Sequence, residues 1–156
     1  MKFTIITIGQ KMPDWVQEGF STYQERFAKP CTLALQEIPL EKRTKSSDIA
    51  LLKLKEAEHI KKLLKPSDFV VALDEKARQF STIELAKQIE TWQHLGKNIC
   101  FIIGGPDGLD KSMLETADLC WSLSPLTFPH PLVRVILAEQ LYRAISVTKN
   151  HPYHRE

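Results

Sequence analysis

Short apolar runs alternate strictly with longer amphipathic stretches along this chain, and that alternation constrains its fold more than any other feature. Apolar runs bounded by turn residues predict five strands, at about residues 2–9, 31–39, 68–74, 98–105 and 119–126. The stretches that follow them predict five helices, at about residues 13–28, 46–64, 81–95, 111–117 and 131–149. Strands that are apolar almost throughout and alternate with helices predict an α/β fold whose mostly parallel sheet is covered on both faces.

The third predicted helix carries sequence signals at both of its ends. Ser81 and Glu84 have the spacing of a capping box, and Gly96 follows the last helical residue. Pro13 suits the first turn of the first helix, where a backbone N–H would have no helical partner. Linkers, internal repeats and low-complexity segments do not occur, so residues 1–156 are expected to form one domain.

Composition and charge exclude several classes of protein. A net charge of +2 is too small to indicate nucleic-acid binding by itself, because phosphate binding depends on local clusters. Cys31, Cys100 and Cys120 lie far apart in apolar runs, which predicts core packing and disfavours a disulfide framework or a zinc site. The first apolar run ends at a glycine without a cleavage site, and no apolar stretch approaches the ~20 residues of a membrane span. We therefore expect a cytoplasmic protein without a membrane partner.

Three irregular segments follow predicted strands, at residues 74–80, 104–108 and 122–130. The carboxyl ends of strands in an open α/β sheet are where ligands bind, so these segments predict one binding site. Gly104 and Gly105 permit positive φ and close approach of a ligand to the backbone, although they also suit a simple tight turn. Residues 74–80 are equally compatible with a solvated connection. Residues 122–130 combine apolar side chains with unpaired backbone groups, which suits a flat heterocycle.

The last predicted helix is apolar around most of its circumference, from Val133 to Val147. Such a helix is either central to the core or packed partly on another subunit, at positions such as Ile136 or Ile145. Its polar residues Glu139, Arg143 and Ser146 share one face, where an ion pair on a solvent-facing stripe is the simpler interpretation. A polar tail, residues 150–156, follows. Its two histidines have no third ligand nearby, so no metal site is predicted.

Several ordered motifs along the chain carry a resemblance to a known family. The SPOUT methyltransferases, and among them small bacterial enzymes that methylate N3 of a pseudouridine in 23S ribosomal RNA, are similar to this sequence over its whole length. The matching segments are Lys11-Met12-Pro13-Asp14-Trp15-Val16, Glu37-Ile38-Pro39, Leu73-Asp74, Ile103-Gly104-Gly105-Pro106-Asp107-Gly108, Ser122-Leu123-Ser124-x-Leu126-Thr127, Pro129-His130-x-Leu132-x-Arg134, Glu139-Gln140-Leu141-Tyr142-Arg143-Ala144 and residues 150–156.

The resemblance implies a Rossmann-like sheet with a C-terminal trefoil knot, which pattern alone would not suggest because knots are rare. It also implies a homodimer that binds S-adenosylmethionine in the knot, beside the partner subunit. Carried over by position, the cofactor-binding residues are Leu73, Gly104, Leu123, Ser124, Pro125, Leu126, Thr127 and Phe128. The family commonly has glycine where this chain has Ala77, which affects the expected shape of the loop after Leu73.

The implied reaction displaces a methyl group from a sulfonium onto N3 of a pseudouridine, so the enzyme must align the reactants and handle the N3 proton. Candidate catalytic residues are His154 and Glu139 for the proton and Arg143 and Arg155 for phosphate or developing charge, with Tyr153 available for stacking. Basic residues could contact ribosomal RNA or simply form a solvated helix face. They are Lys42, Arg43, Lys45, Lys53, Lys55, Lys61, Lys62 and Lys65.

Two other classes of function remain compatible with an α/β chain of this size. A nucleotide- or phosphoryl-handling enzyme is disfavoured because residues 104–108 match neither G-x-G-x-x-G nor a phosphate-binding P-loop. A non-catalytic module that binds RNA or the ribosome would not require the loops at 104–108 and 122–130 to share one edge. Binding of S-adenosylmethionine would distinguish the three classes.

Overall fold

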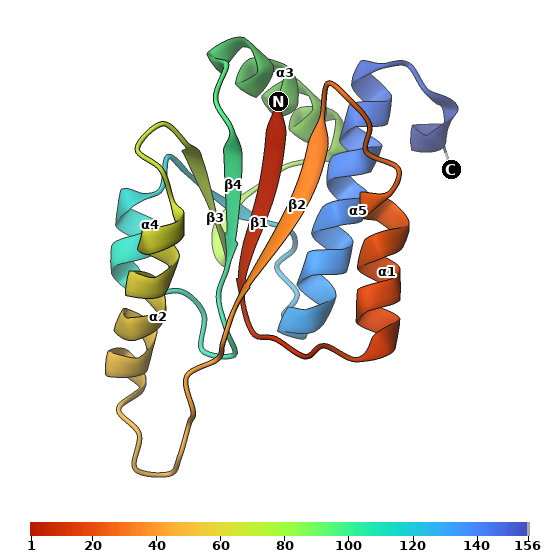
Figure 1. Ribbon diagram of the computed structural model, residues 1–156. Coiled ribbons are helices and arrows are strands. Elements are labelled where there is room, and N and C mark those ends of the chain that lie inside the picture. The colour runs from red at the N-terminus through yellow and green to blue at the C-terminus, as the bar shows by residue number, and fades with distance from the viewer. Residues whose placement is uncertain (156) are drawn as a thin grey trace.

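Five parallel strands form one sheet in the order β2-β1-β4-β3-β5 in the computed structural model (Figure 1). The structure describes residues 1–155, so Glu156, the last residue of the predicted tail, lies outside the described residues. This sheet confirms the predicted α/β fold and its parallel strands. The strands are β1 (Lys2–Ile8), β2 (Thr32–Ile38), β3 (Phe69–Gln79), β4 (Ile99–Ile103) and β5 (Leu119–Ser122).

Helices cover both faces of the sheet, as the apolar strands require. On one face lie α1 (Asp14–Gln24), α3 (Thr82–Leu95) and α5 (His130–Thr148), with α5 packed against the other two (Figure 1). On the other face lie α2 (Ile49–Leu63) and α4 (Lys111–Thr116). A 3₁₀ helix, η1 (Pro152–Arg155), follows α5 and packs back on it.

Alternate side chains of the central strands enter two separate cores. Phe3 and Ile5 of β1 pack beneath α1, α3 and α5, whereas Ile6 and Ile8 pack beneath α2 and α4. This two-sided burial explains why β1 is apolar almost throughout, since a strand with both faces covered has no solvent side. Ile145 of α5 belongs to the first core and is 5% exposed, so its expected role as an interface position is wrong.

The three cysteines pack among apolar side chains, as predicted. Cys31 and Cys100 are buried in the two cores, and Cys120 is half-buried against the second. Burial raises the pKa of the Cys31 thiol above its ordinary value, because an apolar environment disfavours the thiolate. All three are free thiols.

The edge between β3 and β5 differs from the prediction in a way that shapes the site. Leu73 pairs with Trp121, and Arg78 pairs with the same Trp121 after a register shift. Residues 74–77 therefore bulge out of the ladder, and β3 resumes at Arg78 and Gln79. The predicted end of the third strand at residue 74 is wrong for this reason, as is the extension of the fifth strand to residue 126. Ala77 has no positive φ, so the bulge forms without a glycine there.

Two further expectations concern a trefoil knot and membrane-spanning segments. The trefoil knot implied by the resemblance stays a prediction, because strand order alone does not establish threading. Of the helices within residues 1–155, none is long and apolar enough to cross a membrane.

The capping box at the start of α3 offers a test of local stability. The Glu84 N–H donates to the Ser81 hydroxyl at 3.1 Å, and the Ser81 N–H donates to the Glu84 carboxylate at 2.7 Å. Ser81→Ala should lower the free energy of unfolding by about 1 kcal/mol, measured by urea denaturation. Thr91→Ala, on the same helix, should be neutral or slightly stabilising, since the Thr91 hydroxyl only bonds back to the Lys87 carbonyl. Equal stability of Ser81→Ala and the wild type would contradict a stabilising cap.

Candidate functional site

A cavity of about 520 Å³ opens at the carboxyl ends of β3, β4 and β5. Its walls come from the bulge after Leu73, from the loop after Ile103 and from the loop after Ser122, which are the three segments that the sequence places at this edge. Pro125 does not line the cavity. Seven of the eight residues implied as cofactor-binding do line it: Leu73, Gly104, Leu123, Ser124, Leu126, Thr127 and Phe128.

Side-chain hydrogen bonds fix the bulge of β3 to the loop after β5. The buried Ser122 hydroxyl lies 3.0 Å from the Glu75 carbonyl oxygen and 2.9 Å from the Ser124 carbonyl oxygen. The Thr127 hydroxyl donates to the Glu75 carboxylate at 2.8 Å, and the Leu126 N–H donates to the Ser124 hydroxyl at 3.0 Å. Two walls of the cavity are therefore joined to each other, which preorganises them before any ligand binds.

The loop at residues 104–108 closes tightly on itself. A Cβ atom at Gly104 would lie 2.6 Å from the Gly108 carbonyl carbon, which is closer than any real contact allows. The Gly108 N–H donates to the Gly105 carbonyl at 3.0 Å, and Gly108 has a φ of +79°. Gly104 and Gly105 do not use the positive φ that glycine permits, and Gly108 alone in this loop adopts it. Gly104 is needed for the closure of the loop itself.

Charged groups of both signs line the cavity. Asp74, Glu75 and Asp107 contribute carboxylates, and Lys53 and Lys76 contribute ammonium groups. This mixture suits a ligand that carries both positive and negative charge. Within residues 1–155, no three His, Cys, Asp or Glu side chains gather closely enough to hold a metal ion.

His130, the first residue of α5, also lines the cavity, and sequence analysis did not single it out as a site residue. Burial lowers the pKa of its imidazole, and the nearby Arg134 guanidinium lowers it further, so the ring is neutral at pH 7. Arg134 is 2% exposed and pairs with Glu37 at 2.7 Å. The sequence analysis included His130 only as the last residue of the segment at residues 122–130, and its position there at a helix start is the signal that could have identified it.

Three of the predicted catalytic side chains meet beside the second half of α5. The Tyr153 hydroxyl donates to Glu139 at 3.1 Å, and Arg143 pairs with the same carboxylate at 2.7 Å. The Tyr153 ring packs edge-on against Tyr142 at 4.9 Å and lies under the guanidinium of Arg143. The Glu139 and Arg143 side chains are only 15% and 21% exposed. The simpler interpretation of a solvent-facing ion pair is therefore wrong, because this pair anchors the tail.

His154 and Arg155 lie in η1, next to this anchored tyrosine. The Nδ1 atom of His154 forms a hydrogen bond with the carbonyl oxygen of His151. A carbonyl oxygen only accepts, so Nδ1 carries the hydrogen and the lone pair of Nε2 is left available.

The cavity is lined by His130 and Val133 at the start of α5, whereas η1 follows the last residue of α5 and packs back along it. Tyr153 thereby reaches Glu139 in the middle of the helix, nine residues after His130. Within one chain, the structure brings the predicted cofactor-binding residues together and the predicted catalytic residues together, but it does not bring these two groups to one place.

Comparison with known proteins gives three consistent findings. The model of a family described as predicted SPOUT methyltransferase matches residues 1–154. Proteins named ribosomal RNA large subunit methyltransferase H are 48% identical in Thioalkalivibrio sulfidiphilus and 46% identical in Hydrogenovibrio crunogenus, over the full length of both chains. A probable methylase family protein of known structure from Haemophilus influenzae has a similar fold, with a TM-score of 0.56 at 13% identity. That match covers 97% of this chain and 68% of the other.

The hydroxyl of the half-buried Tyr153 provides a test of how the tail is held. Burial, and secondarily the hydrogen bond to Glu139, raise the pKa of Tyr153 from 10.0 to about 12. The docked tail is therefore stabilised below pH 10, and this stabilisation is lost as the pH rises through 12. Alkaline titration of tyrosinate absorbance in the wild type minus Tyr153→Phe should show one group with a pKa near 12. A difference curve with its midpoint near pH 10 would mean that the tail is not docked.

Proposed function

Because the chain belongs to the SPOUT methyltransferase family, and is therefore a methyltransferase, we propose that it transfers the methyl group of S-adenosylmethionine to N3 of a pseudouridine in 23S ribosomal RNA. Full-length relatives named for the RNA of the large ribosomal subunit support this substrate. The observation that carries the proposal is the cavity of about 520 Å³, where the implied cofactor residues meet. Such a substrate also favours a cytoplasmic location.

The residues of the cavity fit the chemistry of this methyl donor. Leu123, Leu126 and Phe128 offer apolar surface for an adenine ring, and backbone groups of the same loop, which lies outside helices and strands, can bind its polar edges. Asp74 and Glu75 offer negative charge near which a sulfonium and an ammonium group are favourable. When bound, the cofactor supplies an electrophilic methyl group. The part of the protein is to position it and to exclude water.

The tail is the proposed source of the groups that act on the RNA base. Glu139 accepts hydrogen bonds from both Tyr153 and Arg143, which supports a role as an anchor of the tail. His154 retains a free lone pair on Nε2, which makes this atom our preferred acceptor for the N3 proton. Arg155 is a cation suited to a phosphate, since its guanidinium forms paired hydrogen bonds with phosphate oxygens.

A homodimer would bring the cavity of one subunit together with the tail of the other. Since neither Glu139 and Arg143 nor residues 153–155 line the cavity of their own chain, we infer that each cavity receives the tail of the partner subunit. Leu132 and Ile136 support an interface along α5, because they are half-buried apolar residues that belong to neither core. A two-fold axis would complete two equivalent sites.

The segment from residue 41 to residue 65 is the proposed RNA-binding surface. It contains eight basic and four acidic side chains, whereas the whole chain has a net charge of only +2. Lys53 lies at the cavity, and Lys42 and Lys45 are exposed in the preceding loop. A basic surface that reaches the cavity suits phosphates on either side of a target nucleotide.

The proposed binding site for S-adenosylmethionine is tested by a substitution at Gly104. Gly104→Val would place a branched side chain against the backbone of Gly108, so the loop must open and S-adenosylmethionine should bind at least about tenfold more weakly. Calorimetric titration measures the dissociation constant. Thr91→Val, an exposed position on α3, is the matched control and should bind normally. A folded Gly104→Val protein that binds the cofactor as the wild type does would show that the pocket is misplaced.

The composite site is tested by mixing two inactive variants. Gly104→Val should lack a working donor site, and a protein truncated after Pro152 should lack the catalytic tail, so each alone should not methylate ribosomes. Mixed dimers would join an intact cavity to an intact tail, and unfolding and refolding the two proteins together should restore about a quarter of the wild-type activity. Sedimentation should show dimers throughout. A truncated protein that retains near-normal methylation, or a mixture that stays inactive although mixed dimers form, would contradict the composite site.

A further inference from the structure

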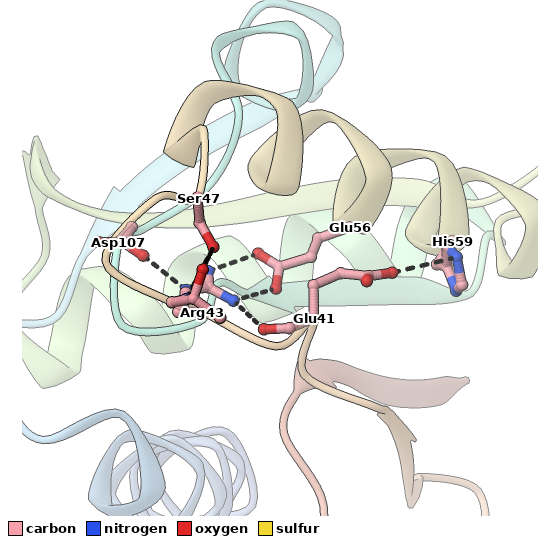
Figure 2. A network of polar contacts seen from close by, with 7 residues as sticks. Glu41, Arg43, Ser47, Glu56, His59 and Asp107 are labelled. Carbon is pink, nitrogen blue, oxygen red and sulfur yellow. Dashed lines mark hydrogen bonds and ion pairs between the residues drawn. The ribbon is translucent and has the colours of Figure 1, made fainter.

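Arg43 is the centre of a network of polar contacts beside the cavity (Figure 2). It lies in the loop that connects β2 to α2, and its guanidinium forms paired hydrogen bonds with Glu56 of α2, at 2.9 and 3.0 Å. The Nε atom donates to Asp107 at 2.8 Å, and Nη1 also donates to the Glu41 carbonyl at 2.8 Å. One side chain thus connects three segments that are distant in the sequence.

The pairing with Glu56 fixes the position of the guanidinium. Glu56 is 3% exposed, and a carboxylate in that environment requires a cationic partner. The hydrogen bonds to Glu56 raise the pKa of Arg43 above its already high ordinary value, so the group stays charged. A planar guanidinium held from one edge by a bidentate pair presents its Nε–H in a fixed direction. In this protein that direction is toward Asp107.

Asp107 belongs to the loop at residues 104–108 that forms one wall of the cavity. The same loop contacts the β2–α2 connection at a second point. A Cβ atom at Gly105 would lie 3.2 Å from the Leu40 side chain and 3.7 Å from the Arg43 guanidinium. The outer side of the cavity wall is therefore braced by Leu40 and Arg43, while its inner side faces the space for the ligand.

We propose that Arg43 is a positioning residue for the methyl-donor pocket, which it shapes by holding Asp107 and the loop at residues 104–108 in place. The inference rests on the proposed function, since it concerns the pocket assigned there to S-adenosylmethionine. Arg43 itself does not line the cavity, so it acts through Asp107. A displacement of a wall by about 1 Å is enough to weaken binding and transfer.

A purely structural role for Arg43, which would only anchor α2 through Glu56, must be separated from this one. The double variant Arg43→Gln with Glu56→Gln removes the brace without leaving a buried carboxylate unpaired. Asp107→Asn removes the negative charge of the carboxylate that Arg43 holds in the cavity wall and so weakens this contact. Lys97→Gln removes one positive charge at an exposed position before β4, outside the proposed sites, and it serves as the control.

Calorimetric titration with S-adenosylmethionine on the full chain, well below the melting temperature of each variant, gives the test. The double variant should bind about tenfold more weakly and Lys97→Gln within about twofold of the wild type. Asp107→Asn should weaken binding about tenfold in the wild-type background but have little further effect in the double variant, because Arg43 acts through Asp107.

Two results would overturn the inference while leaving the proposed function intact. One is a folded double variant that binds the cofactor as tightly as the wild type. The other is an effect of Asp107→Asn that is equally large with and without Arg43 and Glu56, since additive losses would show independent roles. Failure of the wild-type protein itself to bind S-adenosylmethionine would instead overturn the proposed function, and this inference with it.

Discussion

The pairing of β3 with β5 across a register shift is the constraint on which the candidate site depends. Because Leu73 and Arg78 both pair with Trp121, residues 74–77 must leave the ladder, and Asp74, Glu75 and Lys76 of this bulge line the cavity. Ser122 and Thr127 then fasten the loop after β5 to this bulge through Glu75. If residues 74–77 continued as a regular strand, their backbone would pair with β5 and occupy the space of the cavity. The backbones of β3 and β5 do pair with each other on either side of the bulge.

Arginine side chains hold the irregular segments in place around the regular core. Arg43 joins the loop before α2 to the cavity wall, Arg134 joins the start of α5 to Glu37 of β2, and Arg143 joins the end of α5 to the anchored tail. In each case the partner is a carboxylate, and two of the three pairs include paired guanidinium contacts. The planar, permanently charged guanidinium is suited to this task, because it bonds in several fixed directions while it remains ionised when buried.

The separation of the cavity from the tail has a direct consequence for how the proposed enzyme works. The implied cofactor residues line a cavity at the start of α5, whereas the candidate proton acceptor His154 lies in η1, which packs against the second half of the same helix. In the proposed dimer, α5 would both form the interface between the subunits and carry the tail that follows its last residue. The docking of Tyr153 on Tyr142, Glu139 and Arg143 would then present an ordered tail to the partner and lower the entropy cost of forming the site.

The amino-acid sequence alone determined the α/β class, the approximate strands and helices and the three segments of the cavity. These features follow from local periodicity and from the rule that parallel strands end at one edge, so they need no knowledge of distant contacts. Only the tertiary structure decided the bulge at residues 74–77, the need for a glycine at position 104, the contact of Arg43 with the cavity wall and the separation of tail and cavity. Each depends on residues far apart in the chain, such as Arg43 and Asp107, which are 64 positions apart, or Arg134 and Glu37, which are 97 apart. No local pattern encodes which of several acidic side chains a given arginine will meet, because that choice is made by the packing of helices on the sheet.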